Sequence, residues 1–122
     1  MYETTRSSKI YLHNGIVHVI IYESYTLLYE DVMDINIKVN KITNNKKHLK
    51  IIDVRGKFDM EEKSKRFLES KIAKSKIIAQ ALLLGSNTRQ EVVDCFVEMN
   101  CRKMPVKVFV DYDYAINWLT SL

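Results

Sequence analysis

Three short polar segments carry the residues best suited to chemistry in this 122-residue chain: 55–59, 85–89 and 111–113. Each segment follows an apolar, strand-like run and precedes a helix-like one, so all three are expected at the carboxyl edge of a parallel sheet. Helix N-termini offer free N–H groups and positive partial charge, which suit a small anion or phosphate. The candidate ligand-binding residues are Arg55, Lys57, Asp59, Ser86, Asn87, Thr88 and Arg89.

Ordinary helix capping is the competing interpretation of the same segments. Asp59 is placed to cap a helix over 59–70, and Thr88 with Glu91 has the spacing of a capping box. The chain has neither a P-loop nor a GxGxxG motif. Capping is the simpler explanation, and an anion site remains the alternative.

Metal and nucleophilic chemistry find less support in the sequence. A tight metal site needs three or four converging ligands, whereas His13 and His18 are expected to be diagonal neighbours on a hairpin, roughly 7–8 Å apart. Cys95 and Cys101 are too few for a disulfide framework, and neither has a histidine close in sequence. No serine lies in a GxSxG elbow. We therefore expect no metal, no cofactor, no catalytic residue and no enzymatic activity.

Composition indicates one globular domain spanning residues 1–122. Hydrophobic residues make up 47% of the chain and charged residues 28%, an ordinary balance. The net charge of +4 is mild, and the basic residues of segment 63–76 lie among Glu61, Glu62 and Glu69 without an aromatic ladder, so no nucleic-acid partner is expected. No stretch has the length of a membrane span, and the first residues lack an apolar signal region. A cytoplasmic location is the expectation.

Asn14-Gly15 lies between two β-rich runs and predicts a hairpin with a type I′ turn. This turn places His13 opposite Ile16 and gives one fully apolar face, which must contact the core. The other face mixes aromatic, apolar and imidazole side chains, and helices on one side of the sheet would leave it uncovered. The predicted interface residues on this face are Tyr11, His13, Ile16, His18, Ile20 and Tyr22.

We expect this face to pack against a protein partner, most simply a second copy of the chain across a two-fold axis. Its two histidines would weaken such a homodimer as the pH falls through about 6.5, because burying imidazolium charge is unfavourable.

Strand-like and helix-like runs alternate through the rest of the chain, which predicts parallel strands joined by crossover helices. The expected fold is α/β: an N-terminal β-hairpin followed by β-α units, a five-stranded mixed sheet with four helices in the order ββαβαβαβα. In the last helix, the expected core side is Ala115, Trp118, Leu119 and Leu122. After the hairpin, helices are predicted over 26–43, 59–70, 88–100 and 112–122, and strands over 48–54, 77–84 and 106–110.

This order of elements resembles the STAS/SpoIIAA-like family over nearly the whole chain. The strand 49–54, the turn Gly85-Ser86-Asn87-Thr88 and the ending 109–119 carry the resemblance. It implies a cytoplasmic, bacterial regulatory or protein-interaction module without enzymatic activity. The family's phosphorylatable serine has no counterpart, because no Ser or Thr lies between Asp53 and Glu62 and Ser64 falls on a helix stripe. A parallel resemblance to small SEC14-related proteins implies the alternative: a carrier or sensor of a small apolar, lipid-like or anionic ligand between sheet and helices.

Overall fold

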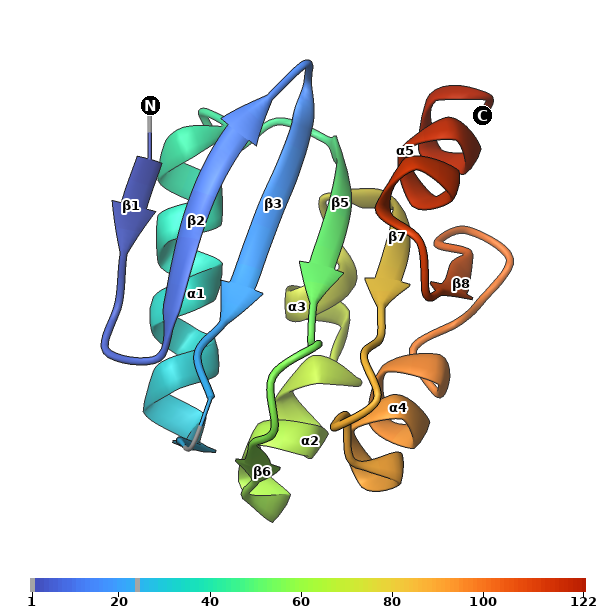
Figure 1. Ribbon diagram of the computed structural model, residues 1–122. Helices are drawn as coiled ribbons and strands as arrows, with labels where there is room; N and C mark the ends of the chain where they lie inside the picture. Colours follow the sequence, from blue (N-terminus) through green and yellow to red (C-terminus); the bar gives the residue numbers. More distant parts are fainter. Residues whose placement is uncertain (1, 24) are drawn as a thin grey trace.

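The computed structural model describes residues 2–23 and 25–122, and its centre is a six-stranded mixed sheet with the strand order β1-β2-β3-β5-β7-β8 (Figure 1). The first three strands are antiparallel, and β3, β5, β7 and β8 run parallel. A separate short ladder joins β4 to β6. The strands are β1 (Tyr2–Thr4), β2 (Ser8–His13), β3 (Ile16–Ile21), β4 (Thr26–Leu27), β5 (His48–Asp53), β6 (Asp59–Met60), β7 (Ile77–Leu83) and β8 (Val106–Phe109).

The α/β class and the mixed sheet are confirmed, but the predicted counts of five strands and four helices are wrong. The described residues add the edge strand β1. The sequence did not predict this strand, because Tyr-Glu-Thr lacks the alternation of apolar and polar residues that is typical of strands. The helix predicted over 59–70 is divided, because Asp59 and Met60 pair with β4 and the Ser70 hydroxyl accepts the Ala73 N–H to start a new turn. The helices are α1 (Tyr29–Ile42), α2 (Glu62–Leu68), α3 (Lys71–Lys74), α4 (Gln90–Val97) and α5 (Tyr112–Thr120).

The predicted hairpin and its register are confirmed. His13 pairs with Ile16 and Tyr11 with His18. Asn14 and Gly15 have φ values of 51° and 76°, the left-handed conformation that a two-residue type I′ turn requires. A local turn signal was therefore enough to fix which side chains share each face of the hairpin.

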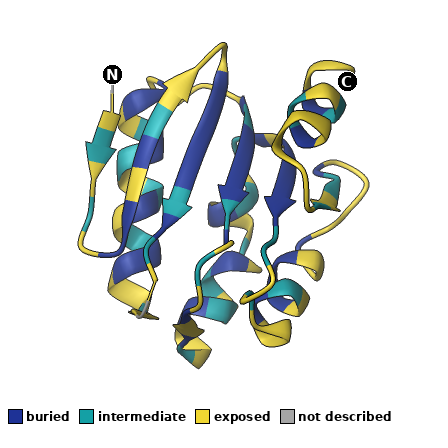
Figure 2. Cartoon of the chain, in the orientation of Figure 1, coloured by how far each residue is buried: buried dark blue, intermediate teal, exposed yellow. Residues whose placement is uncertain are grey.

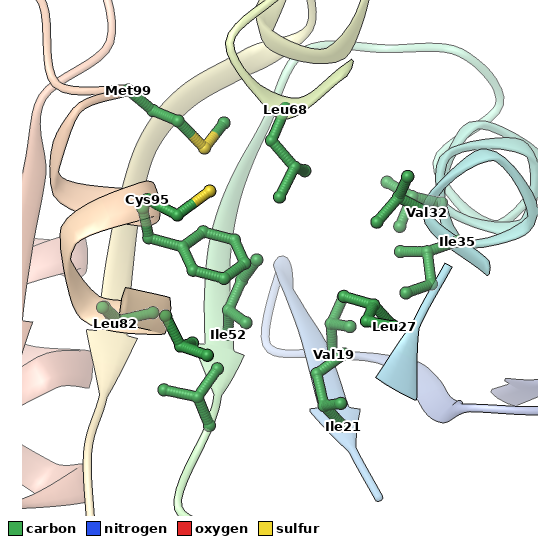
Figure 3. Packing of buried hydrophobic residues seen from close by; sticks show 14 of the residues in the cluster. Val19, Ile21, Leu27, Val32, Ile35, Ile52, Leu68, Leu82, Cys95 and Met99 are labelled. Atoms are coloured by element: carbon green, nitrogen blue, oxygen red, sulfur yellow. The ribbon is translucent and has the colours of Figure 1, made fainter. Parts of the chain in front are cut away.

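Helices cover both faces of the sheet, but unequally. The α1, α2 and α4 helices pack on one face around a large apolar core, in which Val32, Ile35, Val19 and Ile52 take part (Figure 3). On the other face, α5 packs alone over a smaller cluster that includes Ala115 (Figure 1). Helices on one side only were expected, and α5 contradicts this. Because β8 is an edge strand with no further strand to reach, the helix after it is free to return on either face.

The small side chains Ala79, Ala81 and Ala115 meet beneath α5 and allow it to lie close to the sheet. Leu119 is fully buried there, as predicted. Trp118 is only partly buried, against the Phe109 ring, and Leu122 is 62% exposed, so these two expected core residues are peripheral. No helix in the described part of the chain has the length and hydrophobicity needed to cross a bilayer.

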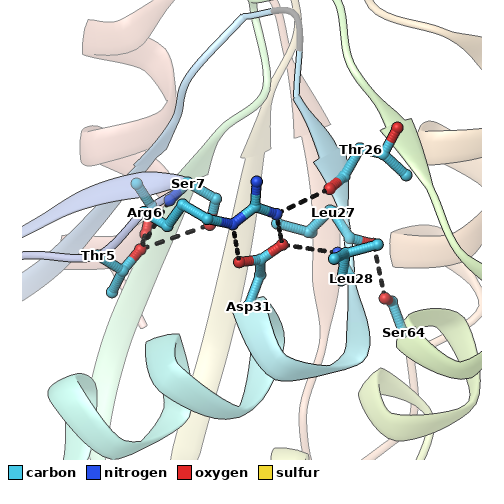
Figure 4. A network of polar contacts seen from close by, with 9 residues as sticks. Thr5, Arg6, Ser7, Thr26, Leu27, Leu28, Asp31 and Ser64 are labelled. Atoms are coloured by element: carbon cyan, nitrogen blue, oxygen red, sulfur yellow. Dashed lines mark hydrogen bonds and ion pairs between the residues drawn. The ribbon is translucent and has the colours of Figure 1, made fainter.

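A polar network joins the N-terminal segment to the start of α1 (Figure 4). Arg6 Nε donates to Asp31 Oδ1 at 3.0 Å, and a second guanidinium nitrogen pairs with Oδ2. Asp31 also accepts the Leu28 N–H at 2.8 Å, which satisfies a free donor at the helix start. Nearby, the Ser64 hydroxyl of α2 donates to the Leu27 carbonyl at 2.7 Å. The network thus fixes how α1 and α2 leave the sheet.

Candidate functional site

The carboxyl edge of the sheet brings together four of the predicted ligand-binding residues. Lys57, Asp59, Asn87 and Arg89 line an open depression of about 460 Å³. Glu23, Tyr25 and Phe58 complete its wall. Arg89 forms an ion pair with Asp59 at 2.7 Å, so its charge is already matched by a carboxylate. The depression is exposed and of mixed charge, which suits a protein surface better than a tight anion site.

The predicted caps do not form. Asp59 lies in β6 instead, and α2 begins after Glu61. Thr88 accepts the Gly85 N–H at 2.9 Å and donates to the Val54 carbonyl at 2.6 Å, so it fastens the turn to the end of β5. A threonine hydroxyl can cap a helix or hold a loop in place. Here the tertiary hydrogen bond to Val54 determines that Thr88 holds the loop.

Gly85 allows that close approach between the turn and β5. A Cβ at this position would lie 2.9 Å from the Arg55 carbonyl oxygen, which is too close for a backbone contact. Ser86, also predicted as a ligand-binding residue, is exposed and does not line the depression.

Arg55 separates from the other predicted residues and faces the hairpin side of the sheet. It makes a two-pronged contact with Asp53, with Nε–Oδ1 and Nη–Oδ2 distances of 3.0 and 2.7 Å, and the hydrogen bond to Asp53 raises the pKa of Arg55. Both side chains line a small cavity of about 50 Å³ together with Tyr11, His18 and Tyr112.

His18 is the centre of this second group. A carbonyl can only accept, so His18 Nδ1 carries the proton that it donates to the Ile16 oxygen at 3.0 Å, and Nε2 accepts the Tyr112 hydroxyl at 2.7 Å. Tyr11 stacks on the imidazole with ring centroids 4.5 Å apart. Burial lowers the pKa of His18, and the bond to Ile16 opposes this. His18 is thus a neutral anchor for α5.

The sequence predicted that Tyr11 and His18 are neighbours, but it held no signal for Tyr112, which lies 94 residues away in the chain. The nearest signal was the polar first turn of the last helix. The pair was instead expected to be exposed, on a face left open by the helices.

The predicted interface divides in the same way. Ile16 and His18 are buried beneath α5 and cannot contact a partner, which corrects their assignment. Tyr11, His13 and Ile20 remain on open surface, where they line a hollow of about 360 Å³ with Tyr2, Lys9 and Leu12. Figure 2 shows β2 exposed toward the hairpin turn beside the buried strands β3, β5 and β7. We call the hollow formed by Tyr2, Lys9, Tyr11, Leu12, His13 and Ile20 the hairpin hollow.

Two further consequences follow for this face. Tyr22 lies beyond the end of β3, near Tyr25, with ring centroids 6.4 Å apart. Because His18 is inside the protomer, only His13 remains to make association depend on pH, and the two-histidine argument no longer holds.

The junction 53–62, where STAS/SpoIIAA-like proteins are expected to carry a phosphorylatable serine, has no serine or threonine, and the next hydroxyl along the chain cannot replace it. Ser64, the first hydroxyl after the junction 53–62, is fully buried and donates its hydroxyl proton to the Leu27 carbonyl. A kinase would have to unpack α2 to reach it.

Comparison with known proteins agrees with this architecture. The chain is similar to a crystal structure of an uncharacterized protein from the DUF3478 family with a SpoIIAA-like fold, from Shewanella loihica PV-4. The two share 13% sequence identity and a TM-score of 0.68, and 98% of each chain is covered. The fold is therefore SpoIIAA-like, as the order of elements predicted.

The chain belongs to the family described as "Domain of unknown function (DUF7793)", whose family model matches residues 10–122. No curated protein matches the sequence.

Proposed function

We propose that this SpoIIAA-like domain is a non-enzymatic regulatory module that binds a protein partner through the hairpin hollow, and that the partner is a second copy of the chain. One observation carries the proposal: α5 covers β5, β7, β8 and the start of β3, where Ile16 and His18 are buried, but leaves β2 and the hollow beside it open. A sheet face without a covering layer is a natural surface for a partner.

The chemistry of the hollow supports the same role. It holds two tyrosines, an isoleucine and a histidine, and the Lys9 ammonium lies 5.2 Å from the centre of the Tyr2 ring. Tyrosine is enriched at protein interfaces because it combines a large apolar ring with a polar end. The open depression at the carboxyl edge, with its Arg89–Asp59 pair, gives a regulatory partner a second, polar surface.

Sedimentation equilibrium tests this proposal. We expect the wild-type chain to dimerise at tens of micromolar, roughly the range of modest interfaces, and Ile20→Lys to weaken the dimer at least tenfold by placing a charge in the hollow. Ile37→Lys is the matched control, because Ile37 is exposed on α1, which packs on the opposite face of the sheet. A wild-type monomer throughout this range would contradict the proposal.

Tyr2→Ala is a second variant, which tests the hairpin hollow in case Ile20→Lys fails to fold. Tyr2 is 63% exposed, so its truncation leaves the core intact, and it should weaken the dimer in the same direction as Ile20→Lys. Unchanged association of a folded Tyr2→Ala and a folded Ile20→Lys would exclude the hairpin hollow.

A second candidate function, a carrier or sensor of a small ligand, is favoured by a separate observation. An apolar cavity of about 20 Å³ lies between the sheet and α1, and its wall includes the buried Lys50. This volume holds about one water molecule, so a ligand must be small. Native mass spectrometry of the purified chain should then show a retained small-molecule mass, and the bare polypeptide mass alone would count against this function.

A further inference from the structure

Lys50 occupies an unusual position in the middle of β5. It lies on the core-facing side of the sheet, is only 7% exposed, and faces α1 and α3. Among the residues that the structure describes, none forms a hydrogen bond or an ion pair with its ammonium group, although the nitrogen itself keeps a small contact with solvent. Burial lowers its pKa to about 8, so the group is still mostly charged at neutral pH. A cation that is largely removed from water and has no ionic partner is unfavourable, and it calls for an anion or a polar ligand.

Two other unpartnered groups flank Lys50. His48, two residues earlier on the same side of β5, is 6% exposed and donates from Nδ1 to the Lys46 carbonyl at 3.0 Å, while its Nε2 has no partner. Gln80, which pairs with Lys50 in register on β7, has an unpartnered Oε1. These are the two buried side-chain atoms without a hydrogen bond in the described chain, and both adjoin Lys50.

Lys50 also separates two small cavities. The outer one, of about 10 Å³, is lined by Asn36 and Asn40 of α1, by His48 and Lys50 of β5, and by Lys76. The inner one, of about 20 Å³, is the apolar cavity described above. Neither is lined by an Asp or Glu among the described residues. The outer cavity therefore offers positive charge and amide donors, and the inner one accepts hydrocarbon.

We propose that a short-chain monocarboxylate binds here, with its carboxylate between Lys50 Nζ and His48 Nε2 and its hydrocarbon end directed at the inner cavity, whose apolar walls must move apart to admit it because the empty space holds only about one water molecule. The carboxylate supplies the charge that Lys50 lacks. His48 takes up a proton at Nε2 as the anion binds, and then donates to the second carboxylate oxygen. The Asn36 and Asn40 amides supply further donors. This inference rests on the second of the two functions proposed above and is independent of dimerisation.

Titration of the full chain with propionate at pH 7 tests it, followed by the chemical shifts of the His48 ring and by calorimetry. We expect saturable binding below about 10 mM, a modest affinity for so small a ligand. Lys50→Met should abolish the binding and His48→Gln should weaken it at least tenfold. Lys47→Met is the control, because it removes the same charge from an exposed side chain three residues away. Propionamide, which has the same shape without the charge, should not bind.

Phosphate and chloride distinguish the ligand class. Equal affinity for these ions would overturn the assignment to a monocarboxylate, because they make no use of the inner cavity. Absence of any propionate shift would mean that the site holds water only. If native mass spectrometry finds a retained ligand that Lys50→Met still carries, the carrier function stands and this inference fails.

The pH dependence gives an independent readout. The titratable groups facing Lys50 are His48 and Lys76, while α1 and α3 contribute only uncharged side chains, namely Asn36, Val39, Asn40, Ile72 and Ala73. Binding should be accompanied by net proton uptake and should weaken as the pH rises well above 8, where Lys50 becomes neutral. Affinity that is constant from pH 7 to pH 10 would overturn the role of Lys50.

Discussion

Replacing Lys50 with methionine is expected to raise the free energy of unfolding by about 3 kcal/mol at pH 7. The pKa of Lys50 falls from an ordinary 10.5 to about 8 because of burial, a difference of about 2.5, and each unit corresponds to about 1.4 kcal/mol. Methionine has a similar length and flexibility, so it can fill the same space without charge. Urea unfolding followed by circular dichroism measures the change.

The sign of the pH dependence follows from the same shift. Between pH 8 and 10.5 the unfolded chain binds more protons at Lys50 than the folded chain, so this group makes wild-type stability rise with pH in that window. The advantage of Lys50→Met should therefore shrink from pH 8 upward and vanish near 10.5. The measured quantity is the difference in the free energy of unfolding between the wild type and Lys50→Met at each pH. Tyrosines that titrate in the same range contribute equally to both proteins and cancel in this difference.

Lys47→Met provides the control again, since an exposed lysine should change stability by less than about 0.5 kcal/mol. Equal unfolding midpoints for the wild type and Lys50→Met at pH 7 would show that the ammonium is not desolvated. A stabilised variant that also loses propionate binding would indicate that stability and ligand recognition compete at one side chain.

Asp31→Ala is expected to lower the free energy of unfolding by about 1.5–3 kcal/mol, the range for charge-assisted hydrogen bonds. The Asp31 side chain is 4% exposed and accepts from the Arg6 guanidinium and from the Leu28 N–H. Its removal leaves the first turn of α1 without this acceptor, whereas Arg6, which is half exposed, regains water. Thermal and urea unfolding measure the loss.

Glu30→Ala is the matched control for this change. Glu30 lies in the same turn but is exposed, so its loss should cost less than about 0.5 kcal/mol. The double variant with Arg6→Ala should be less destabilised than the sum of the single changes, because the two side chains share one contact. A loss below about 1 kcal/mol for Asp31→Ala would contradict its role in fixing α1.

The features that the sequence predicted correctly depend on local signals. Asn14-Gly15 determines a turn and a register by backbone conformation alone, and the alternation of apolar runs reveals parallel strands and crossover helices. The predictions that were wrong concern features that tertiary contacts determine. Thr88 has the chemistry of a cap but bonds to Val54 instead, and α5 has an apolar stripe that fits either face of the sheet.

The candidate sites show the same division. Lys57, Asp59, Asn87 and Arg89 converge because strand ends in a parallel sheet must converge, which is a property of the fold. The buried environment of Lys50 depends on packing by α1 and α3. A lysine two residues before Ile52, on the side of the strand that faces the core, is the one sequence signal that could have drawn attention to it.

The contact between His18 and Tyr112 has a consequence for synthesis of the chain. The α5 helix follows every strand of the described chain in sequence, so it is synthesised after all of them. Until α5 docks, one sheet face leaves Ile16, Ile51 and Leu83 uncovered. Docking of α5 by Ala115 and by the Tyr112 hydroxyl then covers that face and removes apolar surface of the kind that favours aggregation during folding.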